Sequence, residues 1–134
     1  MKAIINTDGG ARGNPGPAAI GIVVRDSSNK IVKEIAKSIG NGTNNEAEYT
    51  ALIEGLKTAK ELFYKELDFY LDSELVVKQL NGSYKVKNDR IKALWLKAKE
   101  LEKNFEKITY THIRREENKR ADALVNEALD SLKA

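Results

Sequence analysis

Apolar residues divide the chain into short runs with strand-like patterning and longer runs with a helical period. Five short runs are apolar or alternate between apolar and polar residues, and turn residues bound them, so they predict β-strands. These runs cover residues 2–7, 19–25, 31–39, 67–71 and 108–113. The third run alternates throughout, which predicts a half-exposed strand near an edge of the sheet.

Four other segments carry apolar residues at three- and four-residue steps, which predicts amphipathic helices. They cover residues 46–59, 75–80, 91–101 and 120–132. The opening hairpins favour antiparallel pairing, whereas the later strand–helix–strand units favour parallel pairing with right-handed crossovers. An α/β fold with a mixed five-stranded sheet and helices on both faces satisfies both signals. Residues 1–134 are expected to form one domain.

Composition narrows the chemistry that the chain can perform. The absence of cysteine excludes disulfides and thiolate metal sites, and a single histidine excludes a multi-histidine site. Any metal must therefore be held mainly by carboxylates, which favours Mg²⁺ or Mn²⁺. The net charge of +3 is only a weak indication of a polyanionic partner. Apolar runs are too short to span a membrane and no signal peptide is recognised, so a cytoplasmic protein is expected.

Four acidic residues stand at positions that are typical of a metal-binding or catalytic site. Asp8 and Asp72 end the first and fourth predicted strands, while Glu48 and Asp122 lie on buried helical stripes, the second of which extends to Leu132. Taken singly, such residues are ordinary turn formers, helix caps or partners of a helix dipole. Ligands, however, gather at the carboxyl ends of parallel strands, where converging carboxylates would repel one another without cations. Two divalent ions about 3.5–4 Å apart would suit phosphodiester hydrolysis.

Four sequence blocks are similar to the signature blocks of type 1 ribonuclease H, in the same order and across nearly the whole chain. They are TDGG…GNPGP at 7–17, TNNEAE at 43–48, LDS at 71–73 and H…ENKRAD at 112–122. The resemblance implies a ribonuclease H catalytic domain that cuts the RNA strand of RNA/DNA hybrids and leaves 5′-phosphate and 3′-hydroxyl ends. Residues 73–90 are too few to hold the long basic protrusion of some bacterial members.

The resemblance also implies roles for individual residues. Asp8, Glu48, Asp72 and Asp122 match the family's metal-binding carboxylates, with Asp8 bridging two Mg²⁺ (or Mn²⁺) ions and Asp122 on the water side. His112 matches the mobile histidine that is proposed to assist proton transfer or product release.

Four polar residues match the family's substrate contacts. Asn14, Asn44 and Asn45 match loop residues that contact the RNA minor groove and the DNA backbone, and Thr43 matches a residue that holds a DNA phosphate. Short amides can recognise the 2′-hydroxyl, which both donates and accepts hydrogen bonds. The implied partner is an RNA/DNA hybrid bound by a monomer, with neither a membrane nor an organic cofactor involved.

Three residues do not follow the family pattern or have no role in it. Glu74 stands where well-known bacterial members have glutamine, and an extra carboxylate there would weaken hybrid binding or change the metal preference. Trp95 fits a core position by its helical spacing, and Asn6 receives no role from the sequence.

Two alternative functions stay open. The same fold serves nucleases that act on double-stranded RNA or on RNA–DNA junctions. A non-catalytic nucleic-acid-binding module would instead bind in a salt-sensitive manner without needing the carboxylates.

Overall fold

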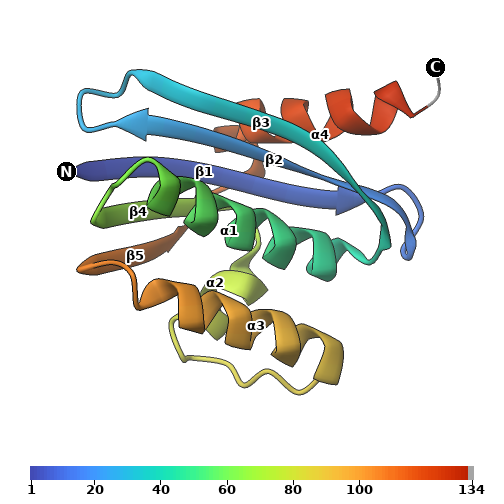
Figure 1. The fold of residues 1–134 in the computed structure, drawn as a ribbon. Helices are drawn as coiled ribbons and strands as arrows, with labels where there is room; N and C mark the ends of the chain where they lie inside the picture. Colours follow the sequence, from blue (N-terminus) through green and yellow to red (C-terminus); the bar gives the residue numbers. More distant parts are fainter. Residues whose placement is uncertain (133–134) are drawn as a thin grey trace.

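The protein, described here by a computed structural model for residues 1–132, is built around one mixed five-stranded sheet (Figure 1). The strands follow the order β3-β2-β1-β4-β5 across the sheet. Antiparallel pairing joins β1 to β2 and β2 to β3, and parallel pairing joins β1 to β4 and β4 to β5. The strands are β1 (Lys2–Ala11), β2 (Gly16–Asp26), β3 (Ile31–Gly42), β4 (Glu66–Leu71) and β5 (Lys107–His112). The predicted fold and the edge position of the third strand are confirmed.

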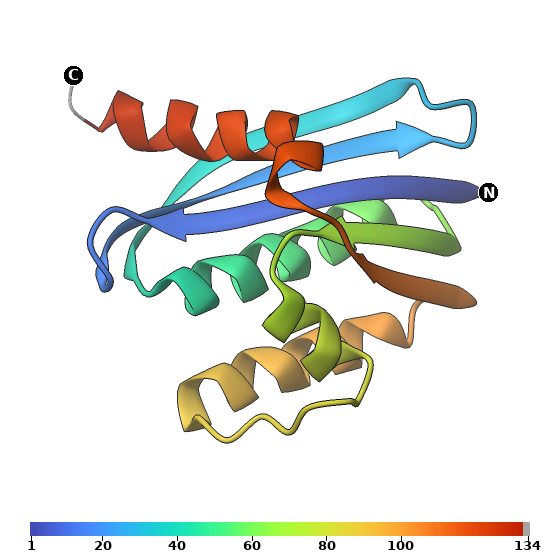
Figure 2. The same cartoon turned by 180° about the vertical axis from the view of Figure 1, so that it is seen from behind.

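Helices cover both faces of the sheet, as the two opposite views show (Figures 1 and 2). One face is covered by α1, with α3 packed against α1, and the other face is covered by α4. The helices are α1 (Asn44–Glu61), α2 (Glu74–Leu80), α3 (Asp89–Glu102) and α4 (Lys119–Ser131). Within residues 1–132, none of them is both long enough and apolar enough to cross a membrane.

Two glycines let the helices approach the sheet from opposite sides. A Cβ atom on Gly9 would lie 2.3 Å from the backbone of Ala47 in α1, and one on Gly21 would lie 2.2 Å from the carbonyl oxygen of Ala121 in α4. Real Cβ atoms do not come this close to backbone atoms, so larger residues here would push each helix away from the sheet. The main core lies on the α1 side, where Ile5, among many apolar side chains, is fully buried.

Several predicted boundaries are wrong. Strand β1 continues through Asp8 to Ala11, so residues 8–11 are strand rather than loop, because they remain paired with β2. Helix α1 begins at Asn44 instead of residue 46, because the side chain of Thr43 accepts a hydrogen bond from the backbone N–H of Glu46 and caps the helix. At the end of α4, Leu132 is 54% exposed and does not continue the buried stripe.

The register of the parallel strands explains how Asp8 can serve a site although it lies inside a strand. Pairing of β1 with β4 ends where Thr7 lies opposite Leu71. Asp8 and Asp72 are therefore the next residues on two neighbouring strands, at the carboxyl end of their shared parallel ladder. Ligand sites in open α/β sheets form at this edge.

Candidate active site

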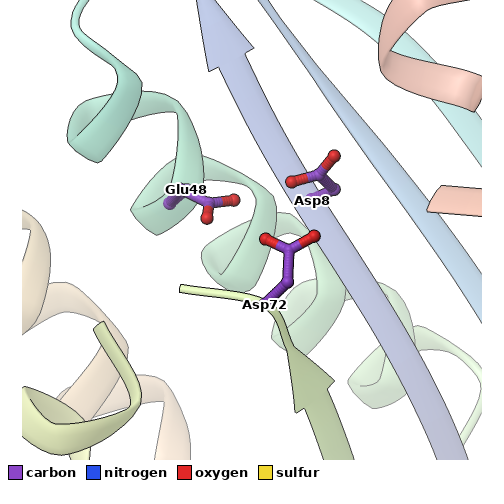
Figure 3. Close-up of side chains that lie close together, drawn as sticks. All are labelled: Asp8, Glu48 and Asp72. Carbon is purple, nitrogen blue, oxygen red and sulfur yellow. The ribbon is translucent and has the colours of Figure 1, made fainter. Parts of the chain in front are cut away.

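Three carboxylates from distant parts of the chain meet at this edge of the sheet (Figure 3). Asp8 comes from β1, Asp72 follows β4, and Glu48 projects from α1. One ligand oxygen from each lies within 4.8 Å of the other two. Asp8 and Glu48 are each 8% exposed, while Asp72 is half-buried. These residues are separated by 40 and 24 positions in sequence, so only the folded sheet brings them together.

Glu48 is positioned by both its helix and the neighbouring strand. The backbone N–H of Gly9 donates a hydrogen bond of 2.6 Å to Oε1 of Glu48. Because Gly9 has no side chain, the first turns of α1 lie directly against β1 at this point. The same close approach that packs α1 therefore also brings Glu48 beside Asp8.

Asp122 borders the same cavity but lies outside the group of three. The cavity has a volume of about 410 Å³, and its lining includes all four predicted carboxylates. Oδ1 of Asp122 lies 3.7 Å from the guanidinium of Arg115, and Oδ2 lies 3.5 Å from the side-chain amide of Asn126. The structure thus brings Asp8, Glu48 and Asp72 within 4.8 Å of one another and places Asp122 in the lining of the same cavity.

Burial and mutual repulsion make it hard to ionise these acids together. Burial, followed by the charges of Asp72 and Asp122, raises the pKa of Asp8 to about 7. Burial and the charges of Asp8 and Asp72 raise the pKa of Glu48 well above its ordinary value. Burial also raises the pKa of Asp72, an effect opposed by a hydrogen bond from Asn118. Such a cluster is unfavourable in a protein unless a cation shares it.

The donor set fits a hard divalent cation. All three converging groups are carboxylates, and Mg²⁺ and Mn²⁺ prefer oxygen ligands. A bound cation would reverse the electrostatic penalty, because its charge favours the ionised form of each acid.

His112 lies beside the cluster rather than in it. It ends β5 and lies opposite Leu71, so it is a close neighbour of Asp72. Its Nδ1 atom is 3.9 Å from Oε2 of Glu74, whose other carboxylate oxygen is 3.5 Å from Lys78. Neither His112 nor Glu74 belongs to the lining of the carboxylate cavity.

The predicted substrate residues gather around the start of α1. Asn44 accepts a hydrogen bond from the backbone N–H of Ala11 through its side chain, and its own N–H donates to the side chain of Asn14. Asn44 and Asn45 line both the carboxylate cavity and a second cavity of about 480 Å³, which Asn14 and Thr43 also line. Asn44 and Asn45 are helical residues, not loop residues as predicted.

Asn118 is a residue of the site that sequence reasoning passed over. It is 1% exposed, and its side-chain amide donates to Oδ2 of Asp72 at 3.2 Å and to the backbone carbonyl of Thr7 at 2.9 Å. An asparagine before a helix is normally interpreted as a cap, which conceals this contact. Trp95 is partly buried and packs against the main core, as predicted, and its indole N–H donates to the backbone carbonyl of Gln79.

Comparisons with known proteins agree with this geometry. A family model described as "Reverse transcriptase-like" matches residues 6–128. Ribonuclease HI of Halobacterium salinarum is 44% identical over 92% of the chain, and the chain spans 62% of that protein. A bifunctional protein of Mycobacterium tuberculosis is 42% identical over 98% of the chain, which corresponds to 36% of its length. The chain is thus shorter than these relatives.

Solved structures extend the comparison to the fold. The crystal structure of RNase H1 from Halobacterium salinarum matches with a TM-score of 0.96 at 41% identity, covering 98% of this chain and 99% of the other. LC11-RNase H1, solved in complex with an RNA/DNA hybrid, matches with a TM-score of 0.94 at 42% identity, covering 98% and 99%. The sheet order and the carboxylate site at the ends of β1 and β4 define a protein with the ribonuclease H fold. The chain belongs to the ribonuclease H family of enzymes.

Proposed function

We propose that this protein is a divalent-metal-dependent endoribonuclease that hydrolyses the RNA strand of RNA/DNA hybrids to 5′-phosphate and 3′-hydroxyl ends. The observation that carries the proposal is the convergence of Asp8, Glu48 and Asp72, whose ligand oxygens lie within 4.8 Å of one another. LC11-RNase H1, of nearly the same fold, was solved with such a hybrid, which supports the choice of substrate.

Each acidic residue has a place in this proposal. Asp8, Glu48 and Asp72 would hold two Mg²⁺ or Mn²⁺ ions, and Asp122, which lines the same cavity, would complete the site. When bound, the ions would supply an activated water and stabilise the leaving oxygen. His112, 39% exposed at the end of β5, would assist proton transfer or product release.

The substrate would lie over the start of α1. Asn14, Asn44 and Asn45 present amide groups beside the carboxylate cavity, where they would contact the 2′-hydroxyl and the sugar–phosphate backbone. Thr43 uses its hydroxyl oxygen to cap α1, yet its O–H can still donate to a DNA phosphate. Such contacts would recognise the sugars and the shape of the hybrid duplex, so cleavage would depend little on its base sequence.

A labelled hybrid of one RNA strand and one DNA strand tests the proposal. We expect cleavage of the RNA strand with Mg²⁺ or Mn²⁺, and none after chelation. Asp8→Asn serves as the inactive control. Glu100→Gln, a change to an exposed acid of α3 that pairs with Lys103, serves as the control for loss of a charge. A wild-type protein that cuts nothing with either metal would overturn the proposal.

The same assay with other duplexes defines the substrate. We expect double-stranded RNA and an RNA–DNA junction to be cut more slowly than the hybrid. Faster cleavage of either would assign the protein to that substrate class, and tight salt-sensitive binding without turnover would indicate a binding module.

A further inference from the structure

Asn118 joins the two strands that carry the central carboxylates. Both hydrogens of its side-chain amide are used, one on the carbonyl of Thr7 and one on Oδ2 of Asp72. Thr7 directly precedes Asp8 on β1, and Asp72 directly follows β4. A single buried amide therefore fixes the position of Asp72 relative to the strand that carries Asp8.

The orientation of this amide is set from outside the cavity. Oδ1 of Asn118 accepts a hydrogen bond of 3.0 Å from Nδ2 of Asn6. Oδ1 of Asn6 in turn accepts one of 3.2 Å from the guanidinium of Arg25. An arginine only donates, so it forces Asn6 to present its NH₂ group to Asn118, which must then present its own NH₂ group to Asp72.

The chain of hydrogen bonds runs along the α4 side of the sheet. Asn6 and Asp8 alternate on this side of β1, and Val23 and Arg25 lie on the same side of β2. Asn118 stands immediately before α4, but within the described chain its side chain makes no bond that caps the helix. Its amide is therefore directed at the strands and at Asp72 instead of at its own helix.

We propose that Asn6 is a positioning residue for the carboxylate site and acts through Asn118 on Asp72. Arg25 fixes which group donates and which accepts in each hydrogen bond of this series. That the three carboxylates bind a metal rests on the proposed function, whereas the hydrogen bonds from Arg25 to Asp72 are observed in the structure independently of it. Partners behind a metal ligand change metal affinity or activity by about 10- to 100-fold in known sites. Asn6 does not line the carboxylate cavity, and within residues 1–132 its side-chain hydrogen bonds go to Asn118 and Arg25, so we expect its effect to reach the site through Asn118.

Asn6→Asp is the sharpest variant, because it keeps the shape of the side chain and removes the donor. The new carboxylate can still accept from Arg25 but repels Oδ1 of Asn118. Asn118 is then expected to turn its NH₂ group toward residue 6 and its oxygen toward Asp72. Asn6→Leu removes the contact without forcing this reversal, so it provides a milder second variant if the first does not fold.

The experiment measures Mg²⁺ binding by titration calorimetry in the absence of nucleic acid, and then kcat and KM on an RNA/DNA hybrid. We expect Asn6→Asp to raise the Mg²⁺ dissociation constant about 10-fold and Asn6→Leu to raise it less. KM for the hybrid should stay constant while kcat at limiting Mg²⁺ falls. Asn29→Asp, which makes the same change in the exposed turn after β2, should behave as wild type.

Each outcome decides the question. Folded Asn6→Asp and Asn6→Leu proteins with wild-type Mg²⁺ affinity would overturn the positioning role, whatever the enzyme cuts. A wild-type protein that binds Mg²⁺ but cleaves no hybrid would overturn the proposed function alone, and the titration would still test Asn6. A wild-type protein that binds neither Mg²⁺ nor Mn²⁺ would overturn both.

Discussion

The two sides of strand β1 are built for opposite tasks. On the side that faces α1, Ala3 and Ile5 are fully buried in the main core, and Gly9 lets the helix lie directly on the strand. On the side that faces α4, alternate residues are polar. Asn6 forms a hydrogen bond with Asn118, and Asp8 belongs to the carboxylate cluster. Because alternate side chains of a strand point to opposite faces, one face of β1 contributes to core packing and the other face contributes to the candidate active site.

This division explains how the fold tolerates a cluster of repelling acids. Buried carboxylates are unfavourable on their own, and the pKa of Asp8 is raised because of it. The apolar face of the same strand supplies the packing that holds Asp8 in place. Changes on the α4 side should therefore affect function more than stability. Changes on the α1 side should affect stability, and should affect function only where they move α1 and Glu48.

Asp8→Asn should give the largest effect. Replacing a residue that only hydrogen-bonds to a metal ligand can reduce activity by about 100-fold. Asp8 would itself be a ligand, so its loss should reduce hybrid cleavage by more than this. The variant should nevertheless fold, because it removes a repelling charge. Initial rates on the labelled hybrid and thermal unfolding in EDTA measure the two effects. A variant that retains most of its activity would contradict the assignment.

Gly9→Ala should affect both stability and activity. The new Cβ atom would lie 2.3 Å from the Ala47 backbone, so α1 must move, at a cost of about 1–3 kcal/mol in the free energy of unfolding. Glu48 would move with the helix, and cleavage should fall. Gly10→Ala is the matched control, because its Cβ atom would meet only Val125, at an ordinary 3.7 Å. Equal denaturation midpoints for the two variants would show that the helix is not so tightly seated.

The pH dependence of stability should distinguish wild type from Asp8→Asn in metal-free buffer. The pKa of Asp8 rises from 3.8 to about 7 on folding, so between these values the folded protein binds more protons than the unfolded chain. Asp8 therefore becomes increasingly destabilising as the pH rises toward 7, where it ionises in the folded protein. The free energy of unfolding of the wild type should fall relative to that of Asp8→Asn over this range. Urea unfolding in EDTA from pH 5 to pH 8 measures this, and parallel curves would count against the electrostatic account.

Thr7→Val should give the smallest effect, and in the opposite direction. Thr7 is 1% exposed on the α1 side, and its hydroxyl oxygen finds no hydrogen-bond partner among residues 1–132. Replacing that hydroxyl with a methyl group of similar shape should raise the free energy of unfolding by up to about 1 kcal/mol without changing cleavage. Destabilisation on urea titration would show that the hydroxyl has an unrecognised partner, such as ordered water.

Much of this arrangement could be predicted from the sequence, because its signals are local. The periodicity around Leu52 placed Glu48 on a buried helical face, and alternation in residues 31–39 indicated an edge strand. The end of β1 was misplaced because the glycine-rich residues after Asp8 resemble a turn, whereas pairing with β2 keeps them extended. Such pairing depends on a partner strand and leaves no local pattern.

The contacts behind the site could not be predicted. Asn6 and Asn118 are 112 positions apart, and each has an ordinary local interpretation, one as a polar strand residue and the other as a helix cap. Only the fold reveals that these two side chains face each other beside Asp72. Long-range hydrogen bonds between single polar residues follow no periodicity, so the sequence holds no signal for them.

The account depends most directly on whether a divalent ion binds between the acids of β1, α1 and β4. Crystals of the protein grown with Mn²⁺, studied by anomalous scattering, would locate such an ion. The account predicts an anomalous peak coordinated by Asp8 together with Glu48 or Asp72, and loss of that peak in Asp8→Asn. Mn²⁺ bound elsewhere, with these three carboxylates separated and without a peak between them, would contradict it.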